Sequence, residues 1–231
     1  MQSLISITFD DGFRCQFDIA LPILNHYQFL ATFFLIANKN ATHDRWTGQH
    51  DNDWWKIDWR DTDIAMLKEV VQDGHEIGSH SVTHDSRKMP TQPESEARES
   101  KLLIEDWIGT TVSSFCYPFY RSHEYLADAV KKAGYAQARG GAGNSYYRVP
   151  GDGSLDRFNI DCREISNTEN VAEWVKPGRW HILTYHGIGN ERDGWAPITV
   201  EQFTGQMSEL AKLRDSGAVE VVTFKDGAAR L

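Results

Sequence analysis

The sequence predicts an α/β fold built around a parallel sheet. Short apolar runs alternate along the chain with amphipathic helical patterns, which is the order of elements in repeated βα units. The length of 231 residues falls within the range that an α/β barrel fills as one unit. Because no internal repeat or low-complexity linker interrupts the pattern, we expect a single domain over residues 1–231.

The expected strands are short apolar runs, and they lie near residues 4–9, 31–36, 75–79, 113–118, 135–139, 157–161, 180–185 and 219–223. The expected helices carry apolar residues at helical spacing, and they span 16–28, 61–73, 94–108, 122–134, 168–176 and 199–216. Thr199, and either Asp61 or Thr62, are suited to cap the helices that follow them, because their side-chain oxygens can accept from free N–H groups of the first turn.

Two segments, 38–59 and 140–156, are rich in Gly, Asn, Asp and Trp, and each follows a predicted strand. We therefore expect both to be loops at the carboxyl end of the barrel, where barrel active sites lie.

Charge and cysteine content exclude several classes of function. The net charge of −9, with 33 acidic against 24 basic residues, disfavours nucleic acid or an anionic membrane as partner, since both attract clustered Lys and Arg. A neutral or cationic substrate fits better. Cys15, Cys116 and Cys162 are odd in number and lack metal-binding spacing, so buried reduced thiols are expected rather than a disulfide framework.

No apolar run approaches the ~20 residues of a membrane span, and no charged segment with an apolar core precedes Leu4. We therefore expect no membrane partner and a cytoplasmic location if the chain is complete. A secreted or periplasmic location is expected if a signal segment has been removed. The sequence does not indicate an oligomeric state.

The most informative motif is Asp10-Asp11-Gly12, which follows an apolar run and is complemented by His80 and His84. Either motif alone is weak, because acidic residues before Gly usually form a turn. Together, two imidazoles four residues apart and one carboxylate form the three-ligand set of a catalytic metal ion, and the other aspartate is left as a base. This donor set suits one divalent ion, with Zn²⁺ preferred and Co²⁺ or Mn²⁺ as alternatives to it.

Four motifs in order make the pattern specific: Thr8–Gly12, Gly74–His84, Phe115–Phe119 and Ile182–Gly187. In these motifs the sequence resembles the polysaccharide deacetylases of the NodB-homology family, also called carbohydrate esterase family 4. The resemblance covers nearly the whole chain. It implies a distorted (β/α) barrel of the seven-stranded NodB type, a divalent metal ion, and hydrolytic removal of acetyl groups from a sugar.

The resemblance also implies roles for individual residues. Asp10 matches the family's base, and Asp11, His80 and His84 match its metal ligands. His186, in the last motif, is expected to protonate the departing amine. The backbone N–H of Phe119, after Pro118, is expected to stabilise the oxyanion, with Tyr117 of the same motif on the substrate side.

The chain departs from the family pattern at Cys116, where many members have an arginine that orients the catalytic aspartate. A thiol cannot hold a carboxylate by paired, charge-assisted hydrogen bonds. Arg139, at the end of a predicted strand, is our candidate for the cation that orients Asp10 instead. The alternative is that Arg139 is an ordinary surface residue. For the acidic partner of His186, Asp161 is the candidate, whereas His75 lies inside a strand-like run and is interpreted as structural.

Loop tryptophans suggest the substrate, because indole faces pack against the C–H groups of sugar rings. Trp55 and Trp195 are the candidates for sugar contact, and Trp55 belongs to a cluster with Trp46, Trp54 and Trp59. Some of these rings are expected only to cover the barrel rim. The length of the loop favours a bounded pocket over an open groove.

Three other functions stay open. The chain could be an O-acetyl esterase acting on acetylated polysaccharide, or an amidase of the allantoinase-like branch acting on small molecules. Loss of the histidine pair would favour a metal-free amidase, and the pair is present. A non-catalytic carbohydrate-binding barrel is disfavoured, because it would not need Asp10, Asp11, His80, His84 and His186 together.

Overall fold

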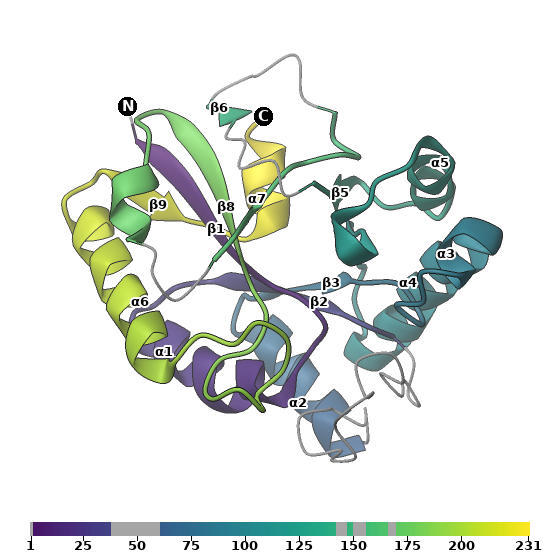
Figure 1. Cartoon of the computed structure of the whole chain (residues 1–231), viewed down its shortest axis with the longest axis horizontal. Helices are drawn as coiled ribbons and strands as arrows, with labels where there is room; N and C mark the ends of the chain where they lie inside the picture. Colours follow the sequence, from purple (N-terminus) through teal and green to yellow (C-terminus); the bar gives the residue numbers. More distant parts are fainter. Residues whose placement is uncertain (1, 38–60, 142–146, 150–155, 166–169) are drawn as a thin grey trace.

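A computed structural model describes residues 2–37, 61–141, 147–149, 156–165 and 170–231. Its strands form one curled sheet in the order β5-β4-β3-β2-β1-β8-β6, with β7 beside β8 and β9 beside β1. All pairings are parallel except β6 with β8. The strands are β1 (Ser3–Phe9), β2 (Ala31–Leu35), β3 (Glu76–Ser79), β4 (Ser114–Cys116), β5 (Gln137–Arg139), β6 (Tyr147–Arg148), β7 (Arg163–Glu164), β8 (Arg179–Tyr185) and β9 (Val219–Val221) (Figure 1).

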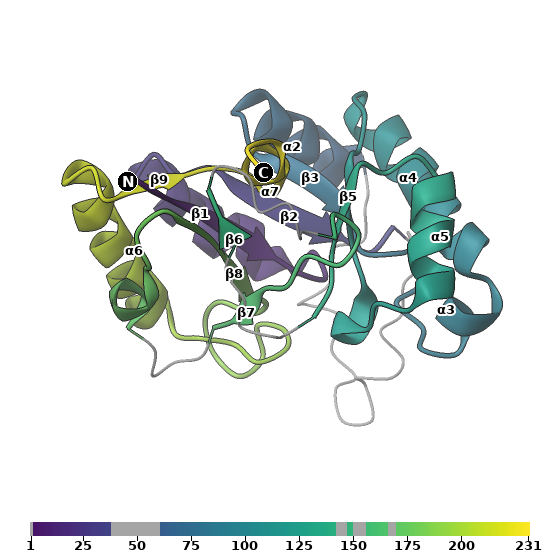
Figure 2. The ribbon, with the colours of Figure 1, turned by 90° about the horizontal axis from the view of Figure 1, so that it is seen from above.

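Most helices lie around the outside of this sheet, whereas α7 packs against its inner face, as Figures 1 and 2 show. They are α1 (Leu21–His26), α2 (Asp61–Gln72), α3 (Lys88–Thr91), α4 (Pro93–Ile108), α5 (Glu124–Lys132), α6 (Val200–Asp215) and α7 (Phe224–Ala229). A π-helical turn (Gln16–Ala20) precedes α1, and 3₁₀ turns occupy Pro118–Tyr120 and Val171–Trp174. In the described part of the chain, no helix is both long and apolar enough to cross a membrane.

The segment after residue 156 curls the sheet toward closure. Ile160 forms a parallel bridge with Arg139, and its N–H donates to the Ala138 carbonyl at 3.0 Å. Three residues later β7 pairs with β8, so this segment connects the two sides of the sheet. The prediction of a strand over 157–161 is therefore wrong except at its end, because the Asp156 carboxylate accepts from the Phe158 N–H at 2.9 Å and forms a turn.

Two further expectations need correction. The expected helix over 168–176 contains only a four-residue 3₁₀ turn in its described part; Lys176 precedes Pro177, a position that disfavours helical geometry. Helix α7 is not among the expected helices, and Gly227 lies inside it. A Cβ at Gly227 would lie 2.4 Å from the Trp180 indole, so the glycine is required by close packing.

The predicted cap at Thr199 is confirmed. Its side chain accepts from the Gln202 N–H at 3.2 Å, and the Gln202 side chain accepts from the Thr199 N–H at 3.3 Å, which completes a capping box. Helix α2 begins at Asp61, so Asp61 and Thr62 both lie within its first turn and the predicted cap at either of them is wrong. Most of the two predicted loops, 38–59 and 140–156, lies outside the described residues.

Side chains of β1 alternate between two environments. Ile5, Ile7 and Phe9 belong to the main core between sheet and helices, whereas Leu4 packs inside the curl with Phe34, Trp180, Ile182 and Phe224. Ser6 and Thr8 also face inward, where Ser6 Oγ accepts from the Trp180 indole N–H at 2.9 Å. A strand's side chains point to opposite faces in turn, so the next inward position after Thr8 is Asp10.

Candidate active site

The site residues continue the inward-facing positions of separate strands beyond their carboxyl ends. Asp10 follows β1, and its N–H donates to the carbonyl of Tyr185 at 3.0 Å. His186 follows β8, which pairs in register with β1. Cys116 and Arg139 end β4 and β5 and are direct register partners. Parallel pairing therefore gathers at one end of the curl side chains that are far apart in the sequence.

Asp11, His80 and His84 form a buried group of potential metal ligands. Oδ1 of Asp11 lies 3.5 Å from His80 Nε2 and 3.6 Å from His84 Nε2. The three ligand atoms lie within 4.8 Å of one another. Oδ1 of Asp11 is buried and has no hydrogen-bond partner among the described residues, which is costly unless a cation neutralises it.

The protonation states of this group also fit a cation. Burial lowers the pKa of His80 to about 4, so the ring is neutral at neutral pH. Its Nδ1 lies 2.9 Å from the Cys116 carbonyl and donates to it, which leaves the Nε2 lone pair facing Asp11. Burial, and then the charge of Asp10, raises the pKa of Asp11 well above its usual range, so this carboxyl needs a neighbouring positive charge to stay ionised. The residues therefore fit a divalent ion.

A second group of potential ligands, formed by Asp10, His80 and Cys116, is less suitable. Asp10 is already paired with Arg139, and burial raises the pKa of the Cys116 thiol well above its usual value. A protonated thiol is a poor metal ligand.

The loop from His80 to His84 is held by Glu96, a buried residue of α4 that the sequence analysis did not identify. One carboxylate oxygen accepts from the N–H groups of Val82 and Thr83 at 3.0 and 2.9 Å, and the other accepts from the Thr83 hydroxyl at 2.7 Å. The Ser81 hydroxyl accepts from the His84 N–H at 3.0 Å. These bonds orient both imidazoles.

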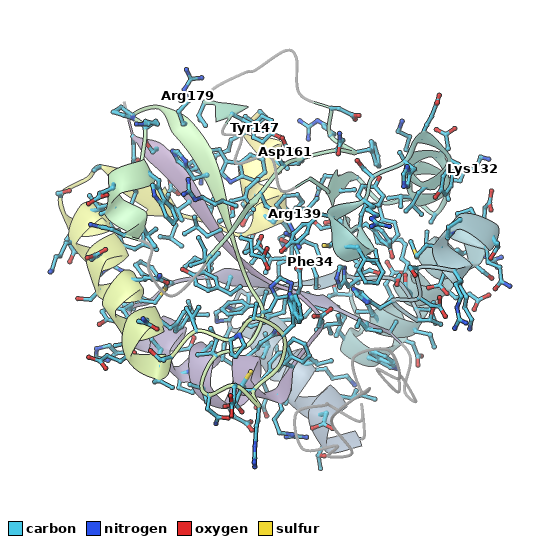
Figure 3. The ribbon with its side chains drawn as sticks, in the orientation of Figure 1. Phe34, Lys132, Arg139, Tyr147, Asp161 and Arg179 are labelled. Carbon is cyan, nitrogen blue, oxygen red and sulfur yellow. The ribbon has the colours of Figure 1, made fainter. Side chains whose placement is uncertain are left out.

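Arg139 binds Asp10, the contact expected from the sequence. Its Nη2 donates to both carboxylate oxygens and lies 2.7 Å from the Cys116 sulfur. Nη1 donates to the Thr184 hydroxyl at 2.6 Å. The guanidinium carbon lies 5.2 Å from the centre of the Phe34 ring, and Figure 3 shows the two side chains as neighbours inside the molecule.

The surroundings of Asp10 act on its pKa in opposite directions. Burial raises it, but the charge of Arg139, with smaller contributions from His80 and His186, outweighs burial and holds the pKa of Asp10 below its usual value. Asp10 is therefore a carboxylate at neutral pH.

His186 lies between two carboxylates. Its Nε2 is 3.8 Å from Asp10 Oδ2, and its Nδ1 is 3.6 Å from Glu164 Oε1. Burial lowers the pKa of His186 to about 4, although the charge of Asp10 opposes this effect. His186 is therefore neutral at neutral pH in the absence of substrate.

The acidic neighbour of His186 is Glu164 and not Asp161, which corrects the sequence-based assignment. Ile160 and Cys162 both pack inside the curl, so the side chain of Asp161 between them points to the opposite side. Its backbone N–H donates to the Tyr147 hydroxyl at 2.7 Å. Glu164 lies two residues after Cys162 in this extended segment, so its side chain again points to the inside of the curl. This alternation was the signal in the sequence that could have identified it.

A cavity of about 630 Å³ opens above these groups. Its lining includes Phe119 and Trp195, which were predicted, and Tyr120 and Glu164, which were not. Tyr117 does not line the cavity. It is fully buried in the main core beside Phe115, because it follows the inward-facing Cys116 and points to the opposite side. Trp46, Trp54, Trp55 and Trp59 lie outside the described residues.

Backbone strain gathers around this cavity. Non-glycine residues with left-handed φ include Asp11 at 76°, His84 at 52°, Phe119 at 60° and Tyr120 at 57°. Such conformations cost about 1–3 kcal/mol each and persist only where the surrounding structure enforces them. The Phe119 ring lies 4.4 Å from the His84 ring, between centroids, so its strained backbone places the ring against the ligand group.

The family model described as polysaccharide deacetylase matches residues 1–138. The relative named "Putative polysaccharide deacetylase YxkH", of Bacillus subtilis (strain 168), is 29% identical over 136 residues, which are 58% of this chain and 43% of that protein. The peptidoglycan-N-acetylglucosamine deacetylase of Bacillus cereus is 27% identical over 198 residues, 83% of this chain and 76% of that protein. A gellan lyase from Bacillus sp is 26% identical over 199 residues, which are 85% of this chain and 6% of that protein.

Solved structures show the same fold. The Xyl-CE4 domain of a multidomain xylanase from the hindgut metagenome of Trinervitermes trinervoides matches with a TM-score of 0.60 and 19% identity, over 99% of this chain and 91% of that one. A family 4 acetyl xylan esterase from Clostridium thermocellum, in complex with a cobalt ion, matches with a TM-score of 0.58 and 20% identity, over 98% and 90%.

The curled parallel barrel, with carboxylates and imidazoles at the carboxyl ends of its strands, has the architecture of the carbohydrate esterase barrels. The family match over more than half of the chain is more specific: this chain belongs to the polysaccharide deacetylase family.

Proposed function

We propose that the chain is a metal-dependent deacetylase that hydrolyses acetyl groups of an acetylated carbohydrate. The observation that supports this most directly is the arrangement of Asp10. It is a carboxylate paired with the buried Arg139, and it lies beside a separate three-ligand group formed by Asp11, His80 and His84. A base that is not itself a ligand, next to a cation site, is what hydrolysis of an unreactive acetamide requires.

The proposed mechanism assigns proton transfers to this chain's own residues. An ion held by Asp11, His80 and His84 would polarise the acetyl carbonyl and lower the pKa of a water molecule. Asp10 accepts the proton of the attacking water. Nε2 of His186, 3.8 Å from Asp10, is placed to pass a proton to the departing nitrogen. Because His186 starts neutral, it relays the proton that Asp10 accepts rather than supplying one of its own.

Three features support an acetylated sugar as substrate. The cavity combines the polar groups with the exposed ring of Trp195 and with Phe119, surfaces on which a sugar ring can pack. The net charge of −9 favours a neutral or cationic substrate. The Bacillus cereus relative is named for peptidoglycan N-acetylglucosamine, so we propose an N-acetylated sugar or its polymer first.

The experiment is an acetate-release screen over acetylated chitooligosaccharides, peptidoglycan fragments, acetylxylan and single N-acetyl sugars, with the dialysed protein before and after addition of Zn²⁺, Co²⁺ or Mn²⁺. We expect release that depends on added metal and is greatest with an N-acetylated saccharide. A preference for acetylxylan would instead establish an O-acetyl esterase.

The His80→Ala/His84→Ala double variant tests the metal site itself by elemental analysis. We expect it to lose both metal and activity. Full retention of metal in this variant would reject the assigned ligands, and failure of the unmodified chain to release acetate from every substrate would reject the proposed activity.

A further inference from the structure

Tyr120 has an unusual environment that the proposed mechanism does not use. It lies in the turn between β4 and α5, and both it and Phe119 adopt left-handed backbone geometry. Its N–H donates to the Tyr117 carbonyl at 3.2 Å, and its own carbonyl accepts from the Gly141 N–H at 3.1 Å. The turn is therefore held at both ends, and the direction of the Tyr120 side chain is set by the fold.

The Tyr120 hydroxyl is buried without a hydrogen-bond partner of good geometry among the described residues. The side chain also lines the 630 Å³ cavity. Burial, and then the charge of Asp10, raises the pKa of Tyr120 well above its usual value, so the hydroxyl keeps its proton and remains a donor. A buried donor that faces a cavity becomes favourable only when a bound group accepts its hydrogen bond.

The position of Tyr120 indicates which part of a substrate it faces. Phe119 packs against the metal-ligand side, 4.4 Å from the His84 ring, whereas the Tyr120 ring lies 6.2 Å from the ring of His186. In the proposed reaction, the acetyl oxygen lies on the ligand side and the departing sugar nitrogen on the His186 side. Tyr120 is thus on the sugar side of the bond that breaks.

We propose that the Tyr120 hydroxyl binds substrate by donating a hydrogen bond to a sugar oxygen next to the acetylated position. This inference rests on the proposed deacetylase function and adds a residue that discriminates for hydroxyl-bearing leaving groups. The alternative acceptor is Glu164: burial raises the pKa of that carboxyl, and the Tyr120 hydroxyl lies close enough to oppose part of this rise. In that case Tyr120 would act through His186 and not on the sugar.

The test compares Tyr120→Phe with Tyr117→Phe. Each change removes one phenolic oxygen and keeps the ring, and the Tyr117 oxygen is also buried without a described partner, but it lies in the core away from the cavity. The readouts are kcat/KM on the best acetylated saccharide from the screen, its pH profile, the inhibition constant of acetate, and metal content.

We expect Tyr120→Phe to lower kcat/KM on the saccharide about 5- to 30-fold, the effect of losing one hydrogen bond to a substrate oxygen. Its acetate inhibition, pH profile and metal content should match the unmodified protein, and Tyr117→Phe should match it throughout. Unchanged kcat/KM in Tyr120→Phe would overturn the inference while leaving the deacetylase function in place. A shifted pH profile, or acetate inhibition weakened in parallel, would overturn it in favour of action through Glu164 or on the acetyl group. An unmodified chain without deacetylase activity would overturn both proposals.

Discussion

Asp10 is oriented by a residue on a neighbouring strand. Cys116 stands where many family members have arginine, and its register partner across the β4–β5 pairing is Arg139. Both side chains face inward, and Arg139 reaches the Asp10 carboxylate from this position. The small thiol leaves room for the guanidinium, which contacts the sulfur atoms of Cys116 and Cys162 at 2.7 and 2.8 Å.

The first prediction concerns this ion pair. The Arg139 charge holds the pKa of Asp10 low, so Arg139→Ala should raise that pKa. Since the base works as a carboxylate, the acidic limb of the kcat/KM profile should shift to higher pH. Arg139→Lys should recover only part of the activity, because the lysine ammonium keeps the positive charge but lacks the fixed set of donors on the planar guanidinium.

Cys116→Arg in the Arg139→Ala background is the reciprocal test, and it should move the acidic limb back toward lower pH. An unshifted limb in Arg139→Ala, with metal content unchanged, would show that another group holds Asp10.

The second prediction separates the base from the ligands. Asp10→Asn should keep metal affinity nearly intact, because Asp10 is not in the Asp11, His80 and His84 group. It should lower kcat by ~10²-fold or more, the scale of losing a general base. Near-normal turnover at neutral pH would assign the base to another residue, and loss of metal would make Asp10 a ligand.

At the scale of elements, α4 supports the proposed metal site from outside the barrel. Glu96 is almost fully buried, and it accepts hydrogen bonds from the Val82 N–H and from the N–H and hydroxyl of Thr83 in the loop between His80 and His84. Support of ligands by neighbouring groups commonly changes metal affinity 10- to 100-fold. The helix therefore affects the site without touching it.

The third prediction is that Glu96→Ala weakens metal binding by about 10-fold or more, because two N–H groups lose their acceptor and the loop loosens. Isothermal titration of the dialysed protein with Zn²⁺ measures this. Glu99→Ala is the matched control, since Glu99 is exposed on the same helix and bonds only Ser95 among the contacts described. Equal Zn²⁺ affinity of both variants would remove Glu96 from this role.

At the scale of the whole molecule, the carboxyl ends and the amino ends of the strands have different roles. The carboxyl ends of the strands carry the strained, charged site. At the amino ends, buried Glu76 accepts from the hydroxyls of Thr32 and Ser114, at 2.8 and 2.5 Å, and from the Lys225 N–H at 2.9 Å. This carboxyl group joins β2, β3 and β4 to α7.

The fourth prediction follows from that division. Glu76→Ala leaves buried donors without an acceptor, so it should lower the free energy of unfolding by about 3 kcal/mol or more, measured by urea denaturation. Below the transition, kcat should stay within a factor of about 2 of the unmodified protein. A strong loss of kcat in the folded variant would mean that the amino end is coupled to the site.

The regular elements were largely predictable, because strand and helix periodicities are local. Apolar runs marked β1 and β8, and helical spacing marked α2, α4, α5 and α6 within a few residues. The predictions failed where a turn-forming or closely packed residue matters more than the periodic pattern of apolar residues. The Asp156 carboxylate forms a turn with the Phe158 N–H that interrupts the predicted strand, and Gly227 inside α7 packs closely on Trp180.

The sequence by itself determined the family and the residues from which a metal site can be built, because Asp10, Asp11, His80, His84 and His186 lie in short motifs that follow apolar strands. Only the tertiary structure decided which side chains meet. The Arg139–Asp10 pair joins residues 129 positions apart, and it depends on the register of β4 with β5 and on the curl of the sheet. The same curl selects Glu164 over Asp161 and turns Tyr120 into the cavity while Tyr117 enters the core. These choices rest on which face of a strand or turn points inward, and strand register and sheet closure set that face through contacts between distant segments.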